Sequence, residues 1–219
     1  MLGTHRHARP APTSRRKSLL IVLAAPLVAL ISIPANAATG WGYDWNPPLD
    51  LTVNGTQAHF VALPESMASL ATQKVVSTAT FRTNWVDVRA LTDGPNIAQQ
   101  GLSVRPPQFK LQIAHGPNPT DHRGDCHIDG ATGHILAYGP RIDVADGNWH
   151  TITCIKYADT ATGTQVIVIV DGVAGTPRWS HTPIGDVTPT GPVRLGGRSA
   201  QASTDSLDGW ISKLTFSAG

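Results

Sequence analysis

The sequence predicts an all-β fold of the sandwich or jelly-roll type. Short β-rich runs follow one another along most of the chain, and turn-forming pairs such as Asp-Gly, Gly-Pro and Thr-Gly separate them. No stretch keeps a helical period over a useful length, and residues 64–70, which begin with a proline, predict at most one short helix. Many short strands at close spacing are typical of two packed antiparallel sheets.

The predicted strands are runs rich in β-branched and aromatic residues. Residues 51–63 look extended, with Asn54-Gly55 as a hairpin turn. The later strands cover residues 75–82, 85–91, 97–100, 109–115, 126–128, 134–138, 149–157, 165–170, 193–195 and 210–216. Both alternating faces of 165–170 are apolar, which predicts a strand covered on both sides.

Alternation along residues 149–157 separates two side-chain faces. Trp149, Thr151 and Thr153 share one face, whereas Cys154 lies on the other face with Ile152. Despite that separation, we expect Trp149 to be a core residue. Phe216, in the last predicted strand, is expected in the core as well.

Residues 1–37 have the features of a secretory signal peptide. An apolar run at 19–33 is followed by Ala35-Asn36-Ala37, a small-residue cleavage pattern. The segment before this run contains five basic residues and no acidic residue: Arg6, Arg9, Arg15, Arg16 and Lys17. A membrane span needs about 20 apolar residues, more than this run supplies. We therefore expect Sec-dependent export, cleavage after Ala37, and no membrane attachment afterwards.

The mature chain is expected to be one domain with a negative net charge. Residues 38–48 are rich in Gly, Pro and aromatic residues and predict a flexible tail; residues 49–219 form the domain. The whole chain has 17 Lys+Arg and 15 Asp+Glu, and removing five bases leaves 12 − 15 = −3. Without a basic cluster that could neutralise a run of phosphates, nucleic acid is not an expected partner.

The chain contains two cysteines, Cys126 and Cys154. In an exported chain, an even number of cysteines favours a disulfide over a metal pair or a catalytic thiol. We therefore predict that Cys126 and Cys154 are bonded to each other.

Several motifs resemble those of laminin-G-like domains with the concanavalin A-like lectin/glucanase jelly roll. They lie, in order, at residues 145–154 (ADGNWHTITC), 170–173 (VDGV), 192–197 (PVRLGG) and 208–211 (DGWI). Residues 96–101 (NIAQQG) and 109–113 (FKLQI), with Cys126 and Cys154, resemble a secreted bacterial subgroup with paired cysteines. The resemblance covers residues 74–216 and implies a two-sheet antiparallel jelly roll. Such domains include lectins, adhesion modules and glycan hydrolases, so the fold does not decide the activity.

The composition argues against the hydrolases of this fold. Laminarinase-type hydrolases of this fold share a strand with the motif E-x-D-x-x-E. Two of its carboxylates, about 5 Å apart, act as nucleophile and general acid. This chain has a single glutamate, Glu65, outside any such pattern, and it contains no G-x-S-x-G motif. We therefore expect no enzymatic activity.

Asp125, His127 and Asp129 alternate on one predicted strand face. Two carboxylates and an imidazole at this spacing are weak candidates for a divalent-metal site. No motif supports calcium, and Ser212-Lys213 replace an acidic pair that is common in related domains. We expect a solvated strand face and no cofactor.

Trp85, Tyr138 and Trp179 are the candidate ligand-binding aromatics, because an exposed ring beside polar groups is suited to stacking on a sugar. The leading interpretation is a secreted, non-catalytic module that binds extracellular or cell-wall carbohydrate, and the charge of −3 favours a neutral glycan. One alternative is a protein-interaction or adhesion module that binds an extracellular protein. Another is an enzyme of unrecognised mechanism.

Overall fold

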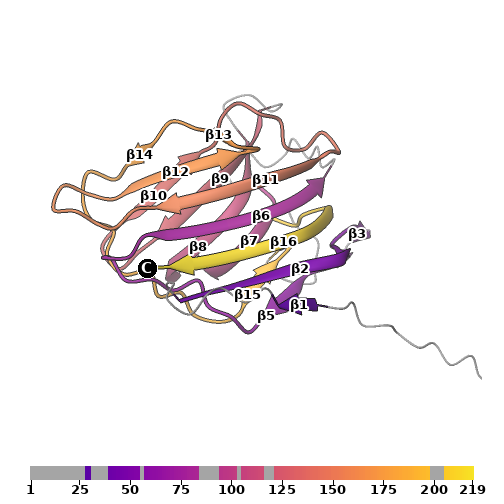
Figure 1. Cartoon of the computed structure of the whole chain (residues 1–219), viewed down its shortest axis with the longest axis horizontal. Coiled ribbons are helices and arrows are strands. Elements are labelled where there is room, and N and C mark those ends of the chain that lie inside the picture. The colour runs from indigo at the N-terminus through magenta and orange to yellow at the C-terminus, as the bar shows by residue number, and fades with distance from the viewer. Residues whose placement is uncertain are drawn as a thin grey trace, which may run out of the picture.

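The structure is a sandwich of two antiparallel sheets (Figure 1). The computed structural model describes residues 28–30, 39–54, 57–83, 94–102, 105–115, 121–197 and 205–219. The larger sheet contains, in spatial order, β1 (Val28–Leu30), β2 (Thr39–Asp50), β16 (Gly209–Ala218), β6 (Val75–Thr83), β11 (Trp149–Lys156), β12 (Gln165–Val170) and β13 (Val173–Ala174), and β14 (Arg178–Trp179) also pairs with β12.

The smaller sheet lies behind the larger one in Figure 1. Its strands, in spatial order, are β10 (His134–Tyr138), β9 (His122–Asp129), β8 (Arg105–His115), β7 (Asn96–Leu102), β15 (Val193–Leu195) and β5 (Val61–Leu63). The described residues contain no helix, so none of them forms a helix able to cross a membrane. The predicted all-β jelly roll is confirmed, and the predicted strand at 85–91 lies outside the described residues.

The inner faces of the two sheets form the core, and a disulfide crosses it. Cys126 on β9 is bonded to Cys154 on β11, with Cα atoms 6.0 Å apart, as predicted. Both cysteines are fully buried. On β8 the core side chains are Phe109, Leu111 and Ile113, which alternate with polar residues. On β12 the second face is only half-buried, so the prediction of cover on both sides was wrong.

The prediction of a flexible tail at residues 38–48 was wrong. Residues 39–50 form β2, which pairs with β16 on one side and with β1 on the other. Trp41, Tyr43 and Trp45 alternate along β2 and pack inward; Trp41 stacks on Phe216 with ring centroids 5.9 Å apart. The prolines fall between the paired residues Asp44 and Leu49, where the register shifts, so their missing N–H groups break no bond to β16.

Residues 64–70 do not form the short helix that their proline suggested. Ser69 instead exchanges two backbone hydrogen bonds with Val187, at 2.7 and 2.9 Å, which hold it in an isolated β-bridge. The predicted hairpin near Asn54 is present, because β3 (Val53–Asn54) pairs with β4 (Gln57–Ala58). Its turn residues, 55 and 56, lie outside the described residues.

Trp149 is not a core residue, so that expectation was wrong. Its side chain is 41% exposed on the outer face of the larger sheet, where the Arg82 guanidinium lies 5.4 Å from its ring centroid and 4.4 Å from that of Trp210. Phe216, by contrast, is buried as expected. The physical reason is strand alternation: Cys154 faces inward, and Trp149 is an odd number of residues away.

His150 joins the start of β11 to the turn after β12. Its Nε2 lies 2.9 Å from Asp146 Oδ1, and its Nδ1 lies 2.7 Å from Asp171 Oδ2. Burial alone would lower the pKa of His150, but hydrogen bonds to Asp171 and Asp146 outweigh burial and raise it above 6.5. The hydrogen bond between His150 and Asp146, together with hydrogen bonds from Asn148, lowers the pKa of Asp146 to about 2.

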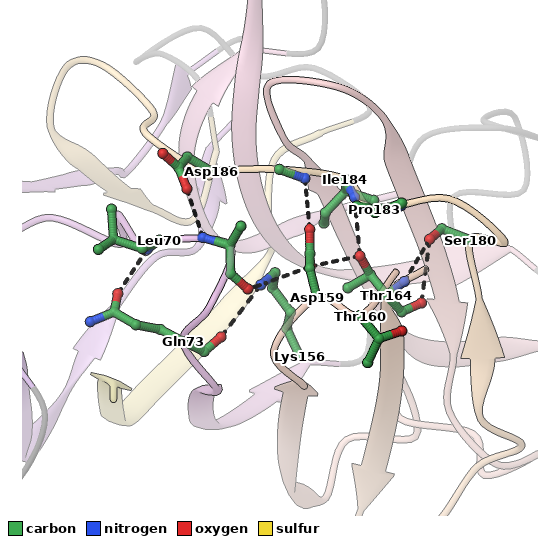
Figure 2. A network of polar contacts seen from close by, with 12 residues as sticks. Leu70, Gln73, Lys156, Asp159, Thr160, Thr164, Ser180, Pro183, Ile184 and Asp186 are labelled. Atoms are coloured by element: carbon green, nitrogen blue, oxygen red, sulfur yellow. Dashed lines mark hydrogen bonds and ion pairs between the residues drawn. The ribbon is translucent and has the colours of Figure 1, made fainter. Parts of the chain in front are cut away.

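A buried ion pair fixes the segment that follows β14 (Figure 2). Lys156 is fully buried, with Nζ 3.4 Å from Asp159 Oδ1. Asp159 accepts hydrogen bonds from Thr164 Oγ1 at 2.7 Å and from the Gly185 N–H at 2.8 Å. Thr164 in turn accepts the N–H of Ile184 at 3.1 Å and donates its own N–H to Ser180 Oγ at 2.9 Å. Residues 180–185 are therefore held in place from both ends.

The His150 cluster predicts a pH-dependent stability. The contribution of His150 is fully present below its unfolded pKa of about 6.5 and is lost as the pH rises through the higher folded pKa. The contribution of Asp146 is present above 3.8 and is lost as the pH falls through about 2. Urea unfolding should therefore show the largest stability difference between wild type and His150→Gln between about pH 4 and pH 6.5. A difference that stays constant from about pH 5 to pH 9 would contradict this assignment.

The Lys156–Asp159 pair predicts a strong effect of removing one partner. Asp159→Ala leaves a buried ammonium without its counter-ion and should cost about 3–5 kcal/mol of unfolding free energy. The double variant Lys156→Met/Asp159→Ala should cost less, because no uncompensated charge remains. Asp44→Ala, at an exposed position, is the control and should stay within about 0.5 kcal/mol. A double variant less stable than Asp159→Ala in urea unfolding would overturn this account.

Candidate functional site

The outer face of the smaller sheet carries a row of polar side chains. Gln108, Lys110 and Gln112 alternate with the core residues of β8, so they stand on the face away from the core. The strand register places Lys110 beside His127, and Gln112 beside Asp125. The three β8 side chains and Asp125 are at most 3% exposed.

Two side-chain oxygens on this row are buried and have no hydrogen-bond partner. Gln112 donates its Nε2–H to Asp125 Oδ2 at 2.9 Å, but Gln112 Oε1 accepts no hydrogen bond. Gln108 Oε1 likewise accepts none. A buried acceptor without a donor carries a desolvation cost of about 1–3 kcal/mol, which a hydroxyl group or a water molecule could relieve. These two oxygens are therefore buried acceptors without a protein donor.

Asp125, His127 and Asp129 do not converge as metal ligands. Asp125 is held by Gln112, whereas His127 Nε2 lies 3.1 Å from Asp129 Oδ1. Across the described ranges, no group of three or more His, Cys, Asp or Glu residues could hold a metal ion. The expectation of a solvated face was wrong for the two aspartates, which are 1% and 8% exposed.

A groove lies where the edges of the two sheets face each other. One hollow of about 430 Å³ runs between β10 and β14 and is lined by residues 133–136 and 178–182. A second hollow, of about 330 Å³, shares Gly133 and His134 with the first and extends to Pro106 and Asp129. The two hollows adjoin at these shared residues, and we call them together the edge groove. Its far end borders the polar row, because Asp129 pairs with Gln108.

Two of the three predicted aromatic residues stand at this edge. Trp179, on β14, lines the groove and is 42% exposed. Tyr138, at the end of β10, is also 42% exposed. Partial burial and then the Asp125 charge raise the pKa of Tyr138, while the charges of Arg123 and Arg178 oppose that shift. Trp85, the third candidate, lies outside the described residues.

The groove also presents an arginine and two histidines that the sequence did not single out. The side chain of Arg178 lines this hollow and makes no hydrogen bond or ion pair with another described residue, so its guanidinium donors are uncommitted. His181 lines the same hollow and has a φ of 60°, in the left-handed region that non-glycine residues seldom adopt. His134 is exposed and completes the set. In the sequence Arg178 and His181 stand in the polar and aromatic run Arg178-Trp179-Ser180-His181 after β13, which does not by itself indicate a site.

No family model and no curated protein sequence matches this chain. Among solved structures, domains LG4-5 of the mouse laminin alpha1 chain align at a TM-score of 0.50 and 16% identity, over 88% of this chain and 45% of the laminin fragment. The chain thus spans less than half of that fragment. The native heptameric SAP-like pentraxin from Limulus polyphemus aligns at 0.50 and 11% identity, over 77% and 73% of the two chains. The alginate lyase Aly36B aligns at 0.43 and 10% identity, over 83% and 84%.

At sequence identities this low, the similarity to these structures shows a shared fold and nothing about function. The two sheets, their antiparallel order and the inter-sheet disulfide agree with the sequence motifs described above. The chain therefore has a laminin-G-like jelly-roll fold of the concanavalin type.

Proposed function

We propose that this protein is a secreted, non-catalytic module that binds extracellular or cell-wall carbohydrate in the edge groove. The observation that carries the proposal is the half-exposed indole of Trp179 on the wall of a hollow of about 430 Å³. A flat aromatic ring can stack on the C–H face of a sugar while polar neighbours bind its hydroxyls. Binding sites of this type are shallow, which agrees with a groove at a sheet edge.

The residues around Trp179 supply the polar contacts that such a ligand needs. Arg178 and the two histidines offer N–H donors, and Ser180 and Thr182 add hydroxyl groups. Tyr138 stands at the other end of β10 and adds a second exposed ring. Stacking and hydrogen bonding are thus available along one edge of the molecule.

The carboxylates support a module that binds without catalysis. The single glutamate, Glu65, accepts a hydrogen bond from the Tyr43 hydroxyl and lines neither hollow. In the lining of the two hollows, the only described carboxylate is Asp129, which is paired with His127. A pair of carboxylates at about 5 Å, as retaining glycosidases use, is therefore not assembled by these lining residues. The signal-peptide pattern of residues 1–37 and the disulfide both favour export.

A second candidate is recognition of an extended protein segment. Among the described strands β10 pairs only with β9, so its other edge lies open toward the groove. An extended peptide can add to such an edge through backbone hydrogen bonds. This is the adhesion-module alternative, and it uses the same surface.

Calorimetry against soluble cell-wall and plant oligosaccharides tests the proposal. Single-site binding should be weak, with Kd roughly 10 μM to 1 mM, because each contact contributes only about 1 kcal/mol. Trp179→Ala should weaken binding about tenfold, since it removes the stacking ring. Trp149→Ala is the matched control, because Trp149 is equally exposed but lies on the outer face of the larger sheet. It should leave Kd unchanged.

Three outcomes would contradict the proposal. If no oligosaccharide binds at millimolar concentration but extended peptides do, the adhesion-module alternative replaces it. If Trp149→Ala weakens binding as much as Trp179→Ala, the groove is not the site. If the purified protein cleaves a bound glycan above a heat-inactivated control, the module is an enzyme.

A further inference from the structure

The hollow of the edge groove beside Trp179 differs in charge from the mature chain as a whole. The hollow beside Trp179 is lined by Arg178, His134 and His181, and its lining residues include no carboxylate. The chain beyond residue 37, in contrast, carries a formal charge of −3. Since a groove concentrates the field of the charges on its walls, an anionic group is favoured here over the rest of the surface.

We propose that the carbohydrate bound in the edge groove is acidic, with its carboxylate or sulfate group at Arg178. This inference rests on the proposed function and replaces the neutral glycan that the net charge alone favoured. It names the ligand class and the residue that selects it.

Arg178 differs from Arg123 and Arg82 because its guanidinium group has no partner that would compete with a ligand. Arg123 is held by a hydrogen-bonded ion pair with Asp121, and Arg82 lies over the rings of Trp149 and Trp210. The Arg178 guanidinium has no such partner among the described residues, although it lies near enough to Tyr138 for its charge to oppose the burial that raises the pKa of that phenol. A planar guanidinium with uncommitted donors matches the two oxygens of a carboxylate and can bind both at once.

His181 is fixed where it can assist Arg178. Its left-handed backbone, with φ of 60°, is a conformation that surrounding structure must impose on a non-glycine residue. The residues on either side supply that restraint, because Ser180 Oγ donates to the carbonyl of Thr182 and accepts the N–H of Thr164. The network drawn in Figure 2 anchors the same segment through Asp159 and Ile184. The imidazole is therefore presented beside Trp179 by a rigid segment.

The other end of the edge groove has the opposite chemistry. Beyond His134 the second hollow reaches Asp129, whose Oδ1 lies 3.1 Å from His127 Nε2. The Asp129 carboxylate supplies acceptor oxygens at this end, and its strand neighbour Gln108 is buried beside it. This end offers acceptors and suits hydroxyl groups. The groove thus orients an oligosaccharide, with an acidic group at Arg178 and neutral hydroxyls toward Asp129.

Matched pairs of polymers test the charge requirement in the full mature chain. We would measure, by calorimetry, the affinity for oligogalacturonate and for its methyl ester, which has the same rings without the charge. Dextran sulfate and dextran form the second pair, so that carboxylate and sulfate are distinguished. The charged member of at least one pair should bind about tenfold more tightly, and raising the salt concentration should weaken it.

Variants locate the effect. Arg178→Gln should abolish the preference for the charged member, because it weakens binding of the charged member more than binding of the uncharged one. Arg194→Gln, on β15 and four strands away from β10 in the sheet order, is the control and should keep the preference. Thermal melting of both variants confirms that each remains folded.

The outcomes separate this inference from the function on which it rests. Equal affinity for both members of each pair would overturn the acidic-ligand proposal and leave carbohydrate binding intact. Failure of all four polymers and of neutral cell-wall oligosaccharides would overturn both. If Arg178→Gln and Arg194→Gln reduce the preference for the charged member equally, the protein attracts polyanions through its overall surface charge. That result would also overturn the assignment to Arg178.

Discussion

The contact between the inner faces of the two sheets determines the rest of this structure. The bond between Cys126 and Cys154 links β9 to β11 across the core, so each cysteine must face inward. Because side chains alternate along a strand, this one constraint directs Asp125 and His127 to the outer face of the smaller sheet. The polar row, and the end of the edge groove that it borders, follow from which side of each strand faces the core.

The same alternation explains which parts of the fold could be predicted from sequence. The strands β10, β12 and β15 were predicted with the limits that the structure shows, because β-branched runs end there in turn residues. The cysteine pair followed from the count and from export. The tail prediction failed because Pro and Gly outweighed the period-two spacing of Trp41, Tyr43 and Trp45, which was the signal of a strand. Trp149 was misassigned although its face, opposite to Cys154, was already evident.

The candidate site was less accessible to sequence reasoning, for a physical reason. The edge groove joins β10 of one sheet to β14 of the other, two segments about 40 residues apart that lie together only after the sheets have packed. Tyr138 and Trp179 could be chosen from their residue types. Arg178 and His181 could not, because their importance depends on uncommitted donors and on a left-handed backbone, which only the structure reveals. The burial of Asp125 and Asp129 was likewise invisible in a pattern of alternating polar residues.

The central claim is that the edge groove, and not the outer face of the larger sheet, contacts sugar. Both surfaces display a half-exposed tryptophan beside an arginine, Trp179 with Arg178 and Trp149 with Arg82. The most direct measurement is a titration of oligogalacturonate into ¹⁵N-labelled protein, monitored at the indole N–H resonances. The account predicts a saturable shift of the Trp179 resonance while those of Trp149 and Trp210 stay in place. Movement of Trp149 and Trp210 with Trp179 unchanged would contradict it.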